Sequence, residues 1–166
     1  EQMNFEVPDV VIYPTGGGTG LIGIWKAFQE MQQMGWIGEK MPRMVVVQTT
    51  ACYPIVKAFH EGATQAPTFP NPAVTRANGL RVPTAFGDEI LLDILYKSKG
   101  NALAISEEEI IEGTKEMAQK EGSLLAPEGA AVWIAFKKLL ADQWIAPNEK
   151  VVLLNTGTIY KYMENY

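Results

Sequence analysis

The stretch that decides the fold is PTGGGTGLIGIW, residues 14–25, in which five of the twelve residues are glycine. It follows an apolar run at residues 10–13 and opens a segment, residues 21–31, whose apolar residues recur at helical spacing. A glycine-rich turn from a buried strand into a helix can bring consecutive backbone N–H groups and the positive end of the helix dipole to one point. The stretch therefore predicts an anion site, with a phosphate as its natural ligand.

Four short apolar runs are typical of strands that are buried in a parallel sheet: residues 10–13, 44–48, 102–105 and 151–154. Helical patterns lie between them at residues 21–31, near 55–60, at 88–96, from the capping box Ser106-x-x-Glu109 to Gly122, and at 128–140. This alternation predicts an α/β fold, a three-layer αβα sandwich around a mainly parallel sheet of about four strands. If the fourth strand returns beside the first, the order is 3-2-1-4. Ligands then bind at residues 15–20 and 155–158, at the carboxyl ends of those two strands.

Length and composition favour one domain, residues 1–166, with an ordinary hydrophobic content of 47% and a charged content of 20%. The net charge of −5 argues against a general nucleic-acid binder. No apolar run approaches the roughly 18 residues of a membrane span. One cysteine, Cys52, and one histidine, His60, make a familiar zinc site impossible, so we expect no metal. A single cysteine suits a reducing compartment, and we expect the cytoplasm.

Two well-known phosphate-binding sequence patterns can be compared with the glycine stretch. The P-loop pattern fails, because Lys26 follows Trp25 and precedes Ala27. The dinucleotide pattern G-x-G-x-x-G is present at Gly18, Gly20 and Gly23, but the next strand ends Gln48-Thr49-Thr50 without the carboxylate that grips a ribose hydroxyl. The NAD interpretation is therefore disfavoured and remains an alternative.

The glycine stretch resembles the cofactor loop of the threonine synthase family. The members of this family are pyridoxal phosphate (PLP) enzymes of the tryptophan-synthase-β fold type. The resemblance extends in the same order over nearly the whole chain, at residues 14–28, 35–37, 42–45, 52–59, 79–83, 127–131 and 155–157. It implies PLP as cofactor and a lyase that converts O-phosphohomoserine and water to threonine and phosphate. Two alternatives stay open: another PLP lyase, such as a threonine dehydratase or cysteate synthase, and a non-catalytic cofactor-binding subunit.

The resemblance also implies the cofactor contacts. Backbone N–H groups of five consecutive residues bind the phosphate: Gly16, Gly17, Gly18, Thr19 and Gly20. The hydroxyl of Thr156 binds the pyridine nitrogen, and a neutral partner of this kind does not force that nitrogen to stay protonated. The chain departs from the family at Thr158-Ile-Tyr-Lys161, because Ile159 stands where relatives have a glycine.

In this family the Schiff-base lysine precedes the glycine loop, and no lysine of the present chain matches its context. We therefore expect residues 1–166 to be the C-terminal, phosphate-binding part of a longer enzyme, without a catalytic residue of its own and inactive alone. The expected partners are the N-terminal domain, an amino-acid substrate and, at full length, a second copy in a homodimer. The proline-rich segment 62–88 is too long for a simple link. Within it, Arg81 either contacts a substrate phosphate or a partner chain, or is an ordinary surface residue. Outside this segment, Glu128 either lies near the cofactor or caps its own helix.

Overall fold

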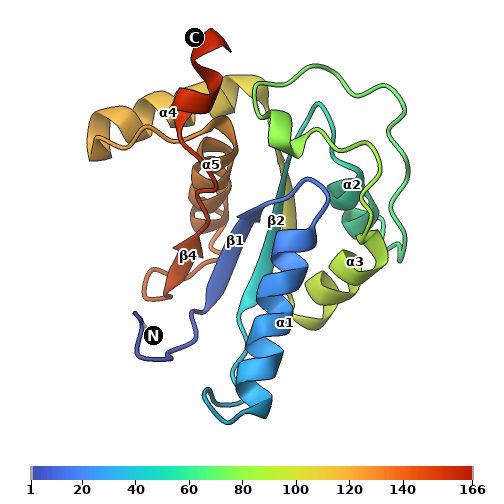
Figure 1. Ribbon diagram of the computed structural model, residues 1–166, viewed down its shortest axis with the longest axis vertical. Coiled ribbons are helices and arrows are strands. Elements are labelled where there is room, and N and C mark those ends of the chain that lie inside the picture. The colour runs from blue at the N-terminus through green and yellow to red at the C-terminus, as the bar shows by residue number, and fades with distance from the viewer. Residues whose placement is uncertain (1, 166) are drawn as a thin grey trace.

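The sheet has four parallel strands in the order β3-β2-β1-β4, which confirms the predicted order (Figure 1). The structure is a computed structural model that describes residues 2–165, without the side chains of residues 164 and 165. The strands are β1 (Val10–Pro14), β2 (Arg43–Thr49), β3 (Asn101–Ile105) and β4 (Val151–Leu153). Each coincides within a residue or two with one of the apolar runs, because a strand covered on both faces needs apolar residues at every position.

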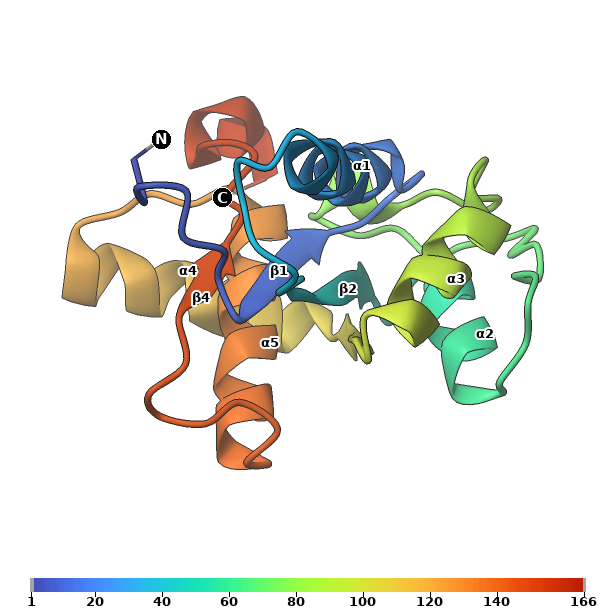
Figure 2. The same ribbon diagram turned by 90° about the horizontal axis from the view of Figure 1, so that it is seen from below.

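Helices cover both faces of the sheet and give the predicted α/β sandwich (Figure 2). They are α1 (Thr19–Gln33), α2 (Pro54–His60), α3 (Asp88–Lys97), α4 (Glu107–Glu121) and α5 (Pro127–Ala141). Successive strand residues point to opposite faces. Val11 and Val46 thus pack in the cluster formed with α1, α2 and α3, whereas Ile12 and Val47 pack with α4 and α5.

The predicted helix boundaries follow local capping chemistry. The Ser106 hydroxyl accepts from the Glu109 N–H at 3.3 Å, and the Glu109 carboxylate accepts from the Ser106 N–H at 3.1 Å, as the capping box requires. Gly122, with φ +62°, ends α4 in the left-handed conformation. These caps fix the register of α4, which packs against α5 on the face of the sheet opposite α1.

The segment 62–88 crosses the carboxyl-end edge of the sheet and contains one short 3-10 helix, η1 (Asn78–Leu80). Leu80 is buried in the cluster that includes α5, so η1 is anchored to the core. A second 3-10 segment, η2 (Ile159–Asn165), follows β4. Both segments therefore flank the ends of β1 and β4. Over the described residues, no helix combines the length and apolar character that crossing a membrane requires.

Candidate functional site

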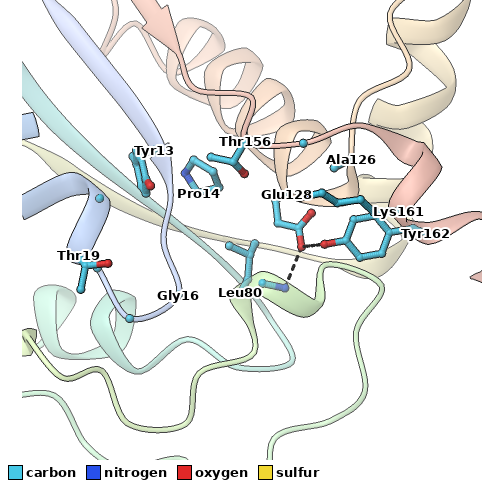
Figure 3. Close-up of a pocket in the computed structure, with 15 residues that line it drawn as sticks. Tyr13, Pro14, Gly16, Thr19, Leu80, Ala126, Glu128, Thr156, Lys161 and Tyr162 are labelled. Carbon is cyan, nitrogen blue, oxygen red and sulfur yellow. Dashed lines mark hydrogen bonds between the residues drawn. The ribbon is translucent and has the colours of Figure 1, made fainter. Parts of the chain in front are cut away.

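A cavity of about 280 Å³ lies at the carboxyl ends of β1 and β4, the position that the strand order predicts (Figure 3). All six residues expected to contact a cofactor line it: Gly16, Gly17, Gly18, Thr19, Gly20 and Thr156. The remaining lining residues come from the end of β1, from η1, from the start of α5, from Gly157 and from η2. The fold thus brings together two segments that are more than a hundred residues apart in the sequence.

The loop after β1 presents backbone N–H groups without protein partners. The N–H of Thr15 still donates to the carbonyl of Val47 at 2.8 Å, and the first bond of the next helix runs from the N–H of Ile22 to the carbonyl of Gly18 at 3.1 Å. Between them, no N–H of residues 16–21, which include the five loop residues 16–20, donates a hydrogen bond to any residue that the structure describes, and no side chain caps α1. Unpaired donors at a helix N-terminus form a cradle for an anion.

The tight course of this loop explains two of its glycines. Gly18 is the N-cap of α1 and has φ +88°, a left-handed conformation that side-chain-bearing residues rarely adopt. A Cβ atom on Gly18 would also collide with the side chain of Leu91 in α3. A Cβ atom on Gly16 would collide with the backbone carbonyl oxygen of Gly79 in η1. The cradle is therefore shaped by packing from α3 and η1 as well as by its own backbone.

The opposite side of the cavity begins with the segment after β4. The N–H of Leu154 donates to the carbonyl of Ile12 at 3.0 Å and extends the pairing of β4 with β1. The carbonyl of Gly157 accepts from the N–H of Ala126, just before α5, at 3.2 Å. Thr156 lies between these two fixed points, solvent-exposed, with its side chain at the cavity (Figure 3).

Three residues complete this wall: Glu128, Lys161 and Tyr162 (Figure 3). Glu128 is 5% exposed, and its Oε1 accepts from the N–H of Gly79 at 2.8 Å and from the hydroxyl of Tyr162 at 2.7 Å. It lines the cavity and also stands in the first turn of α5, where a carboxylate is favourable, so both roles left open by the sequence fit its position. Burial and the hydrogen bond to Glu128 raise the pKa of the Tyr162 hydroxyl, which therefore stays a donor.

Sequence reasoning missed Lys161 and Tyr162 as cavity residues. Lys161 ends the segment where the chain departs from the family pattern, Tyr162 follows it directly, and no periodicity marks either residue. Lys161 Nζ lies close to Gly157, beside Thr156, and has no carboxylate within salt-bridge distance among the described residues. Arg81, by contrast, is exposed, does not line the cavity, and donates to the carbonyl of Pro72 at 3.1 Å.

Known proteins similar to this chain carry the same fold and related sequences. A threonine synthase of Methanocaldococcus jannaschii is 37% identical over 157 residues, which are 95% of this chain and 38% of that protein. A cysteate synthase of Methanococcoides burtonii is 27% identical over 95% of this chain and 38% of its own length. The crystal structure of threonine synthase from Escherichia coli matches 99% of this chain and 36% of its own with a TM-score of 0.69 at 17% identity.

The chain thus spans about two fifths of the length of the curated relatives that it matches. The family model described as "Pyridoxal-phosphate dependent enzyme" matches residues 1–157, which include the glycine loop, Glu128 and Thr156. The cofactor of that family is pyridoxal phosphate. By this match the chain belongs to the family of pyridoxal-phosphate dependent enzymes.

Proposed function

We propose that the cavity binds pyridoxal phosphate and that the backbone N–H groups of residues 16–20 hold its phosphate. The observation that carries this proposal is the run of five consecutive N–H groups without partners among the described residues, at the start of α1 and at the edge of the cavity. Such donors suit a phosphate dianion, because they lie at the positive end of the helix dipole and can bind an anion without a countercharged side chain. The donor set therefore fits the phosphate of the family's cofactor.

The other cavity residues have complementary roles in this proposal. The Thr156 hydroxyl binds the pyridine nitrogen and, being neutral, leaves that nitrogen free to stay unprotonated. The Lys161 ammonium adds positive charge to a cavity that receives an anion. The Glu128 carboxylate repels the anion less than an unpaired carboxylate would, since two hydrogen-bond donors bind its Oε1. Pyridoxal phosphate, when bound, supplies an electron sink for elimination and replacement reactions of amino acids.

We propose that the whole protein is a longer, homodimeric enzyme in which this chain is the phosphate-binding part and another segment supplies the catalytic lysine. Its reaction is the conversion of O-phosphohomoserine and water to threonine and phosphate. The identity of 37% with a threonine synthase over 95% of this chain supports this activity. The similar coverage by a cysteate synthase, at the lower identity of 27%, supports a related lyase as the second candidate.

The test is a product analysis with the full-length protein and PLP. Incubation with O-phosphohomoserine should release threonine and inorganic phosphate in equal amounts. In separate incubations, release of a 2-oxo acid from threonine, or formation of cysteate from sulfite and a three-carbon amino acid with a leaving group on its β-carbon, would favour the related lyase if O-phosphohomoserine gives no threonine. A full-length protein that binds PLP and turns over none of these substrates would be a cofactor-binding subunit and would overturn the enzymatic proposal.

A further inference from the structure

Glu128 is a buried carboxylate to which the cofactor contacts above assign no direct part. It stands in the first turn of α5, on the wall of the cavity that faces the glycine loop (Figure 3). A buried charge is costly unless hydrogen bonds compensate for it. Here the same oxygen, Oε1, receives both the N–H of Gly79 and the hydroxyl of Tyr162. The carboxylate therefore ties η1 and η2 to the N-terminus of α5.

Gly79 passes this restraint on to the glycine loop. Its N–H is bonded to Glu128, while its carbonyl oxygen lies so close to Gly16 that a Cβ atom there would collide with it. The neighbouring Leu80 is 1% exposed and holds η1 in the core. The position of Gly79 is thus set on one side by the Glu128 carboxylate and on the core side by Leu80. Gly16 packs against the carbonyl oxygen of the Gly79 held in this way.

An acidic side chain is an unfavourable choice for the wall of an anion site unless its position does something that a neutral residue does not. A hydrogen bond to a charged acceptor is about twice as strong as one between neutral groups. The carboxylate can therefore hold a short, partly exposed turn such as η1 more firmly than a neutral acceptor could. Its own charge is partly compensated by the two donors on Oε1.

We propose that Glu128 is a positioning residue for the phosphate cradle, acting through Gly79 on Gly16. This inference rests on the proposed binding of PLP at the cavity. It implies that loss of the carboxylate weakens the contact with the phosphate group and spares the contacts with the rest of the cofactor.

The test compares the affinities of the full-length protein for PLP and for pyridoxal, which lacks the phosphate, by equilibrium dialysis. Glu128→Ala should raise the Kd for PLP about tenfold, the effect of one hydrogen bond to a charged group. It should change the Kd for pyridoxal less than about twofold. Glu128→Gln keeps an acceptor oxygen at the same reach but without the charge, so it should recover only part of the loss. Glu108→Gln, an exposed carboxylate of α4, is the matched control and should leave both constants unchanged.

Glu128→Asp serves if the alanine variant does not fold, because it keeps the charge but withdraws the oxygen by one methylene from Gly79. It should again weaken PLP more than pyridoxal. Equal losses for both ligands, or no loss for either, would overturn the positioning role while PLP binding by the unaltered protein stands. If the unaltered protein itself shows no preference for PLP over pyridoxal, the proposed phosphate site fails, and the role of Glu128 fails with it.

Discussion

Replacing Gly18 by alanine should destabilise the protein strongly, because two independent costs meet at this position. Gly18 has φ +88° at the N-cap of α1, and a side-chain-bearing residue pays about 1–2 kcal/mol to adopt a left-handed conformation. The added methyl group would also enter the space of Leu91, which is fully buried in the core. Overpacking of this kind costs about 1–3 kcal/mol.

The two costs together predict a loss of about 2–5 kcal/mol in the free energy of unfolding. This is a large share of the roughly 5–15 kcal/mol that keeps a typical protein folded. Gly17→Ala is the matched control, because a Cβ atom on Gly17 meets no atom within 4 Å and its backbone does not require a left-handed conformation. Its effect should stay within about 0.5 kcal/mol.

Urea unfolding, followed by circular dichroism and analysed by linear extrapolation, measures both variants under the same conditions. A loss below about 1 kcal/mol for Gly18→Ala would refute the reasoning, since relief of either cost alone leaves about that much. An equal loss for Gly17→Ala would refute it too, because the cost would then not come from the left-handed backbone and Leu91.

Three further predictions concern the cavity, a helix cap and acid stability. Lys161→Met should raise the Kd for PLP up to about fivefold in dialysis at low salt, as expected for a partly screened charge, and an unchanged Kd would exclude the ammonium from the site. Ser106→Ala should lower the free energy of urea unfolding by about 1 kcal/mol through loss of the capping box, and no change would contradict that cap. Hydrogen bonds from Lys120 and Lys137 hold the pKa of Glu116 at about 2, below its ordinary 4.5. The stabilising effect of the ionised Glu116 is therefore complete above about pH 4.5 and is lost as the pH falls towards 2. Urea midpoints measured across this pH range should fall less steeply for Glu116→Gln than for the unaltered protein. Parallel curves for the two proteins would contradict the lowered pKa of Glu116.

The strands could be predicted because each depends on a local pattern. The apolar runs mark β1 and β2 without reference to any other part of the chain. The order 3-2-1-4 needs one assumption, that the fourth strand returns beside the first, and the structure has that strand there. The same topology predicts that the glycine loop and Thr156 lie at one cavity, where the structure has them.

The wall opposite the glycine loop could not be predicted in the same way, because long-range contacts build it. Glu128 bonds to Gly79, 49 residues earlier, and to Tyr162, 34 residues later. Neither pair leaves a periodic or compositional signal. The collision that excludes a side chain at Gly18 is likewise visible only once α3 is in place and Leu91 lies beside the loop. From the sequence, the glycines are interpreted as residues that let a ligand approach the backbone. The structure adds a second reason, which is that side chains at Gly16 and Gly18 would collide with neighbouring residues.

The most direct test of the central claim is an NMR titration of the ¹⁵N-labelled protein with PLP and, separately, with pyridoxal. The account predicts that the amide signals of residues 16–20, whose N–H groups have no described protein partner, shift on addition of PLP and stay in place with pyridoxal. Saturation with PLP that leaves these five signals unmoved, or equal shifts with pyridoxal, would contradict the assignment of this loop as the phosphate cradle.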